Sequence, residues 1–188
     1  MLGDETLKAL NTFGDRVVID SKKNLKRRNK VSSGRLINSI NYKSKVSKNS
    51  FELSFEMEQY GLFVDAGVEG IGGTKKDGSK WKIKRVTKSS LFGKKLSYKG
   101  NMKSSGGRFL QSLGGWTIKR GIAPRDKDGK FMKRKSLIFA IRKSIFHTGI
   151  ESTKFFVTPF EKGFKKLPEE LVEAYALDAE NLLKFAVK

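Results

Sequence analysis

The positive charge of this chain is concentrated in one segment, and that concentration limits what the segment can fold into. Residues 71–150 contain 22 lysine and arginine side chains against three acidic ones, so they carry +19 of the total formal charge of +21. The residues on either side of this segment are close to charge balance. Because like charges repel one another, such a segment needs a polyanionic or acidic neighbour when it packs closely. We therefore expect it to be an excursion from a nearly neutral core.

The flanking residues predict that core as an α+β fold, in which an antiparallel sheet packs against long N-terminal and C-terminal helices. Apolar residues recur at helical spacing from residue 5 to about 27, after an acidic cap at Asp4. Residues 51–57 alternate between apolar and polar side chains, which predicts a strand with its phenyl rings on the core face, paired with a strand at 41–46. Pro168 and the two glutamates after it predict the start of the last helix.

The length of 188 residues fits one α+β domain, 1–188, better than two full domains. A basic insertion at about 71–135 is expected to leave this domain as a long loop or hairpin. Apolar spacing predicts a helix at about 108–120, followed by a loop with a sharp Asp-Gly turn. Ser136 is expected to cap the next helix, which ends at Gly149.

Residue types that carry catalysis or bind metals are scarce in this chain. Cysteine is absent and His147 is the one histidine, which excludes disulfides, thiolate metal sites and a histidine-based zinc site. Asp65 and Glu69 lack the further ligands that a magnesium-dependent nuclease recruits. We therefore predict no catalytic residue, no metal and no cofactor. The sequence has neither a membrane-spanning apolar run nor a secretory signal, so we expect a soluble protein.

The basic segment interleaves cations with aromatic side chains, a pattern typical of nucleic-acid-binding surfaces. Cations neutralise phosphates, and rings such as Trp81 stack on bases. Docking on an acidic protein would use the same composition, so nucleic acid and acidic protein both remain open as partners. The candidate contacts for either partner are Lys75, Lys76, Lys80, Lys82, Lys84, Arg85, Lys88, Lys94, Lys95 and Lys99.

Five short motifs follow one another between the first and last predicted helices. They are SSGRLINSI at 32–40, YGLFVDAGVEG at 60–70, WTIKRGI at 116–122, RKSLIFAIRKSI at 134–145 and KFFVTPF at 154–160. In this order they resemble the tail-completion, or neck, proteins of tailed bacteriophages, also called minor tail or head-tail joining proteins. The resemblance covers nearly the whole chain. It departs from the family pattern at Gly61, where alanine is usual, and in the glycine-rich residues before Trp116.

The resemblance implies a structural virion protein whose copies assemble as a ring in the neck or tail region, after synthesis in the host cytoplasm. Such a ring joins the portal region to the tail and helps to seal the packaged DNA. The implied partners are other copies of the chain, the portal, and the adjacent connector and tail proteins. The packaged double-stranded DNA is a further candidate partner, and no membrane is involved. The alternative is a non-specific nucleic-acid-binding protein that uses residues 71–150.

A ring also needs apolar and aromatic surface on each copy. The candidate subunit interface comprises Phe155, Phe156, Phe160, Phe164 and Tyr175. The competing interpretation places these rings in the core of the protomer, and for Phe155 and Phe156 it is the favoured one.

Overall fold

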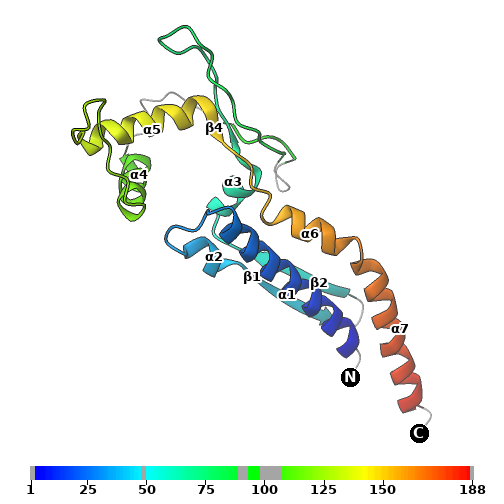
Figure 1. The fold of residues 1–188 in the computed structure, drawn as a ribbon. Coiled ribbons are helices and arrows are strands. Elements are labelled where there is room, and N and C mark those ends of the chain that lie inside the picture. The colour runs from blue at the N-terminus through cyan, green and yellow to red at the C-terminus, as the bar shows by residue number, and fades with distance from the viewer. Residues whose placement is uncertain (1–2, 48–49, 89–92, 98–106, 187–188) are drawn as a thin grey trace. The chain divides into compact units, whose positions relative to one another are not determined.

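The computed structural model describes residues 3–47, 50–88, 93–97 and 107–186, and it has the α+β fold that the sequence predicts (Figure 1). The contacts divide the chain into two compact units. The first unit combines residues 1–61 with 154–188, and the second comprises residues 62–153. The expected insertion therefore lies inside the second unit. That unit carries 22 basic and six acidic side chains, a net charge of +16.

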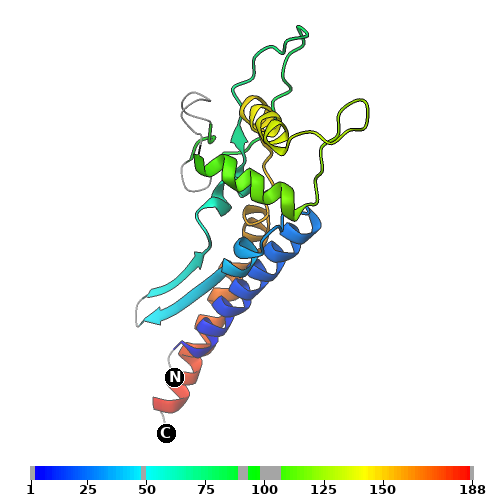
Figure 2. The same ribbon diagram turned by 90° about the vertical axis from the view of Figure 1, so that its left-hand side faces the viewer.

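The first unit is built from two long helices, a β-hairpin and two short helices. Its elements are α1 (Asp4–Arg27), α2 (Arg35–Ser39), β1 (Asn41–Ser47), β2 (Ser50–Glu56), α6 (Val157–Phe164) and α7 (Leu167–Ala186). The strands pair antiparallel from Asn41 opposite Glu56 to Ser47 opposite Ser50, which confirms the predicted hairpin. Helix α1 lies along this hairpin (Figure 2). Helix α7 also packs on α1, and the two run antiparallel (Figure 1).

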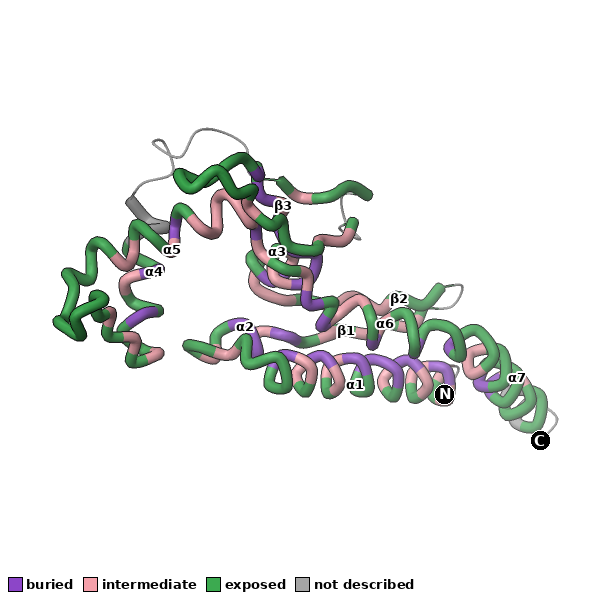
Figure 3. The backbone as a smooth tube through the Cα atoms, turned by 45° about the horizontal axis from the view of Figure 1, so that its top comes forward, coloured by how far each residue is buried: buried purple, intermediate pink, exposed green. Residues whose placement is uncertain are grey.

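The core of this unit forms where α1, β2, α6 and α7 meet. Phe13 of α1 is 2% exposed, and its ring lies 6.1 Å from that of Phe55 and 5.8 Å from that of Phe160, both in edge-on contacts. Val17 and Leu167 complete the buried cluster. Figure 3 shows the buried residues of α1 along one side of the helix, as its apolar spacing requires.

Close packing around Phe13 depends on a glycine in α6, because glycine has no side chain. A Cβ atom added at Gly163 would lie 2.7 Å from the Phe13 ring, so α6 approaches α1 more closely than any other residue type would allow. The predicted inward face of β2 is confirmed for Leu53 and Phe55, which pack against the cluster. Phe51, at the start of the strand, is 53% exposed and does not reach the cluster.

The N-terminus of α1 is capped by a side chain from the other end of the chain. The prediction of a cap at Asp4 is wrong, because Asp4 is already the first helical residue and follows Gly3. The backbone N–H groups of Glu5 and Thr6 instead donate to the carboxylate of Asp178 in α7, at 3.1 and 3.0 Å. The Thr6 hydroxyl donates to the same carboxylate at 2.7 Å. These three hydrogen bonds join the first turn of α1 to α7.

The described part of the second unit contains two helices, most of a third and a short antiparallel strand pair. Its elements are β3 (Val68–Glu69), α4 (Gly107–Lys119), α5 (Arg134–Thr148) and β4 (Gly149–Ile150), and α3 (Tyr60–Ala66) leads into it. Helices α4 and α5 confirm the two predicted helices, although α5 begins earlier than we expected. Its N-cap is Lys133, so Ser136 lies inside the first turn and is not the cap. Gly149 ends α5 as predicted, with a φ of 82° that favours glycine.

None of the helices among the described residues is both long and apolar enough to cross a membrane.

Candidate polyanion and subunit surfaces

The first candidate surface is a tight hairpin at residues 74–80 in the second unit. Thr74 and Lys80 form an isolated antiparallel bridge, and the backbone N–H of Lys75 donates to the carbonyl of Ser79 at 2.7 Å. Asp77 accepts hydrogen bonds from the hydroxyl and the backbone N–H of Ser79, and the hydroxyl contact is the main cause that lowers its pKa. These contacts fix the turn, while Lys75, Lys76 and Lys80 are all exposed.

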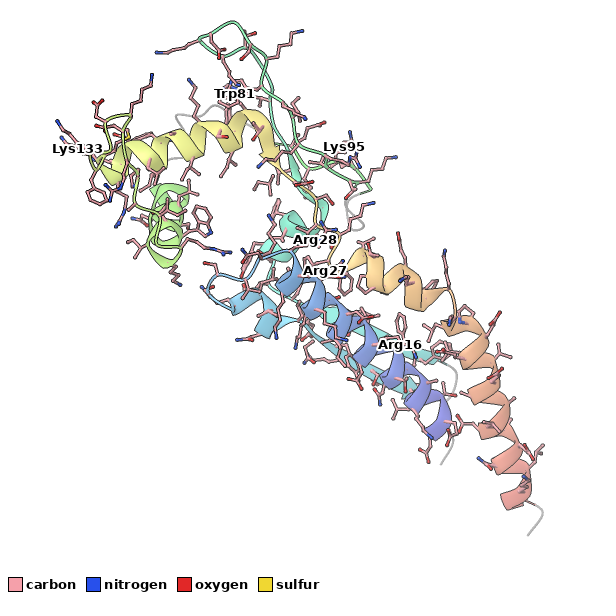
Figure 4. All side chains as sticks on the ribbon, viewed as in Figure 1. Arg16, Arg27, Arg28, Trp81, Lys95 and Lys133 are labelled. Carbon is pink, nitrogen blue, oxygen red and sulfur yellow. The ribbon has the colours of Figure 1, made fainter. Side chains whose placement is uncertain are left out.

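Trp81 anchors the base of this hairpin, beside the C-terminal end of α5 (Figure 4). Its indole stacks on the His147 ring, with centroids 5.0 Å apart and planes within 6°. The His147 ring is held in turn by a 2.6 Å hydrogen bond between its Nδ1 and the carbonyl oxygen of Gly72. The Nζ of Lys75 lies 5.2 Å from the centre of the Trp81 ring. One indole face is thus engaged inside the unit, with Lys75 close to the same ring.

An extended segment at 82–88 carries four more of the candidate cations. It forms no regular strand in the part of the chain that the structure describes. Its backbone is nevertheless fixed, because the N–H of Lys84 donates to the carbonyl of Thr148 at 2.7 Å and the N–H of Ser152 donates to that of Arg85 at 3.0 Å. The four cationic residues on it are exposed, namely Lys82, Lys84, Arg85 and Lys88.

The remaining candidate lysines differ in their surroundings. Lys94 is exposed, whereas Lys95 forms an ion pair with Glu69 at 3.7 Å. Lys99 lies outside the described residues.

Asp65 is 6% exposed and lies at the end of α3, close to β3. No group of three or more His, Cys, Asp or Glu side chains suited to a metal ion occurs in the part of the chain that the structure describes.

The candidate subunit interface separates into core and surface. Phe155 is fully buried in the first unit, which removes it from any surface contact and supports the competing interpretation. Phe156 and Phe160 are half-buried and pack on the Phe13 cluster. Phe164, whose ring stacks on that of Phe160, is 51% exposed, and Tyr175 is 61% exposed. Only these last two rings offer substantial apolar area to a neighbour.

A longer apolar row on α7 accompanies Tyr175, and we did not single it out from the sequence. Val172 and Leu183 are 70% and 68% exposed. At helical spacing Val172, Tyr175, Ala179 and Leu183 share one face, next to the face that carries the buried Leu167, Ala174 and Asp178. The sequence does contain a sign of this row, because α7 has more apolar residues than one core-facing stripe requires.

A second hairpin lies at residues 124–132, where the sequence predicted a loop with a sharp Asp-Gly turn. The N–H of Asp126 donates to the carbonyl of Lys130, and the N–H of Met132 donates to that of Pro124, both at 2.9 Å. Phe131 is 68% exposed, with the Arg125 guanidinium 4.0 Å from its ring centre. The hairpin therefore presents an aromatic side chain on a fixed backbone.

Comparisons with protein-family models, with curated proteins and with solved structures find no match to this chain.

Proposed function

We propose that this chain is a structural virion protein of a tailed bacteriophage, a ring-forming neck, head-to-tail connector or tail-completion component. In this role it joins the portal region to the tail and helps to seal the packaged DNA. The proposal starts from the five motifs and their order. The observation that carries it further is the exposed apolar row on α7, because a monomer gains nothing from Val172, Tyr175 and Leu183 in water.

In a ring, those exposed side chains would be buried between neighbouring copies. Interfaces between subunits have an apolar, aromatic centre with polar groups around it. Val172, Tyr175, Leu183 and Phe164 supply the centre, and the exposed glutamates of α7 supply the surround. Copies that meet head to tail through unlike surfaces form a ring when the rotation closes.

The charge of the second unit supports a second contact of the assembly. Its net charge of +16 comes from side chains that are mostly exposed, and seven of the 22 basic ones lie on the 74–88 stretch, whose backbone is fixed by hydrogen bonds. Such a surface binds polyanions or acidic proteins through long-range attraction. In a neck it would face the packaged DNA or an acidic patch of the portal or tail.

The test is the mass and shape of the purified full-length protein. Mass photometry over increasing concentration, with electron microscopy of the same samples, should show one closed oligomer of defined size. A protein that stays monomeric throughout, and that also fails to join complexes with portal and tail proteins made by the same genome, would contradict the proposal.

Non-specific nucleic-acid binding is the second candidate, favoured by the exposed lysines of the 74–80 hairpin. Each lysine that neutralises a phosphate adds about 0.9 to the slope of log affinity against log salt. Replacing Lys75, Lys76 and Lys80 together by alanine should therefore lower that slope by about 2–3. Fluorescence anisotropy with duplex DNA at several salt concentrations measures it.

The matched control removes the same charge elsewhere, at lysines that pair with acids in the first unit. Lys8, Lys43 and Lys184 contact Glu5, Glu56 and Glu180 respectively. Their joint replacement by alanine should leave the slope nearly unchanged. Equal losses in both triple variants would show that net charge, and not this hairpin, determines DNA affinity.

A further inference from the structure

Helix α7 is the most acidic element of a strongly basic chain. It contains five acidic side chains and one basic side chain, Lys184, within a protein of net charge +21. Two of the acids are engaged inside the first unit, because Asp178 caps α1 and Glu170 forms an ion pair with Arg16 at 3.8 Å. Glu180 contacts Lys184 at 2.6 Å. Glu169 and Glu173 are exposed and make no ion pair among the described residues.

Three exposed acids and the exposed apolar row of α7 form one continuous surface. Glu169, Glu173 and Glu180 recur at helical spacing, as Val172, Tyr175, Ala179 and Leu183 do. The two rows therefore run side by side along the helix. We call this combination the α7 outer face. It fits a partner that presents an apolar side chain flanked by cations.

The second unit presents such a group on the 124–132 hairpin. Phe131 and Met132 are 68% and 43% exposed at the hairpin's end. Residues 125–135 contain six basic side chains and two acidic ones, a net charge of +4. The carboxylate of Asp126 accepts hydrogen bonds from the N–H groups of Asp128 and Lys130, so it stabilises the turn.

Rigidity favours this hairpin as a binding element. The side chain of Arg125 donates to the carbonyl of Gly129 at 2.9 Å, which adds to the backbone bonds across the turn. A hairpin that is ordered before binding loses less conformational entropy when it docks. An exposed aromatic ring on such a support is the kind of group that contributes most to interface affinity.

We propose that the α7 outer face of one copy binds the 124–132 hairpin of the next copy. The inference rests on the proposed function and names the surfaces by which its ring is built. It selects this hairpin over the 74–80 hairpin, because residues 75–80 of the latter carry no apolar side chain that could meet Val172, Tyr175 or Leu183. The contact joins unlike surfaces, so repeated copies continue in one direction and close as a ring when the rotation between neighbours closes.

The test reverses charge on each surface of the full-length protein. One variant carries Glu169→Lys and Glu173→Lys, and the other carries Lys127→Glu and Lys130→Glu. All four side chains are exposed, so both variants should keep the circular dichroism of the parent, and the melting temperature should fall slightly only in the variant with Glu169→Lys, because Glu169 lies in the first turn of α7. Sedimentation velocity should show self-association weakened at least tenfold in each variant alone.

A mixture of the two variants should associate again. In it, the basic α7 of the first variant faces the acidic hairpin of the second, while the acidic α7 of the second faces the basic hairpin of the first. Every contact of an alternating assembly is then complementary. Phe131→Ala should independently weaken association at least tenfold without lowering the melting temperature.

Two control variants test whether another basic surface of the chain binds the α7 outer face instead of the 124–132 hairpin. Lys75→Glu with Lys76→Glu makes the same charge change on the other hairpin, and Lys23→Glu with Lys26→Glu makes it at the basic end of α1. Both should associate as the parent does. Loss of association in either control, with the 127/130 variant unaffected, would assign the contact to that surface and overturn the proposal.

The failure of this inference is distinguishable from that of the proposed function. If the parent forms rings and the charge-reversed variants form them equally well, or if the mixture fails to associate, the named surfaces are wrong and the ring stands. If the parent never associates and is absent from portal-tail complexes, both are overturned.

Discussion

Replacing Phe13 by alanine should lower the free energy of unfolding of the first unit by about 3–5 kcal/mol. Phe13 is 2% exposed and contacts the rings of both Phe55 and Phe160, so its removal leaves a cavity between α1, β2 and α6. Domains of this size are typically stable by only about 5–15 kcal/mol. Urea denaturation followed by circular dichroism measures the loss.

Phe51 provides the matched control because it is the same residue type in the same unit. It lies 53% exposed at the start of β2, so Phe51→Ala should cost about 1 kcal/mol or less. Similar losses at Phe13 and Phe51 would mean that the aromatic cluster is not the core of this unit. A smaller urea dependence in the Phe13 variant would further indicate a partly opened native state.

Replacing Asp178 by alanine should cost about 2–3 kcal/mol, because hydrogen bonds to a charged group contribute more than neutral ones. The substitution leaves the N–H groups of Glu5 and Thr6 and the Thr6 hydroxyl without their acceptor. Asp178→Asn keeps the shape but loses the charge and one acceptor, so its cost should be smaller. Thr6→Val removes one donor alone and should cost less in the Asp178→Ala background than in the parent.

The same contact predicts how the stability depends on pH. Burial by itself raises the pKa of Asp178, but the hydrogen bonds from Thr6 and Glu5 more than offset this, so the pKa lies below its ordinary value of 3.8. The ionised carboxylate therefore stabilises the folded state at every pH above that ordinary value. The stabilisation is lost as the pH falls through the lower, folded-state pKa.

The stability difference between the parent and Asp178→Asn should accordingly be constant near neutral pH and shrink in acid. Urea titrations at a series of pH values down to the acid range measure it. A difference that grows as the pH falls would contradict the charged cap.

Local patterns in the sequence predicted the elements that depend on local chemistry. The spacing of Leu10, Phe13 and Val17 is enough for α1, and the alternation around Leu53 and Phe55 is enough for the hairpin. Gly149 marked the end of α5 because glycine, which has no Cβ, tolerates the positive φ found there.

The contacts between distant residues could not be read in the same way. Asp178 lies more than 170 residues from Thr6, and no local rule links a carboxylate in the last helix to the first turn of α1. The stack of Trp81 on His147 likewise joins a hairpin to the end of a helix. The division into two units also depends on such contacts, since residues 154–188 return to residues 1–61.

The candidate surfaces were predictable in composition but not in arrangement. The lysines of the basic segment were evident, yet their fixed positions depend on backbone bonds such as that from Lys84 to Thr148. From the sequence alone Phe155 is a candidate interface residue, but in the structure it is completely buried. Exposure alone separates it from Tyr175, and exposure is a property of the packed chain.

A reconstruction of the intact particle produced by the same genome is the decisive measurement. We expect a closed ring of this chain between portal and tail, with the α7 outer face of each copy on the 124–132 hairpin of the next. Density for the particle's neck and tail that leaves no place for this chain would contradict it.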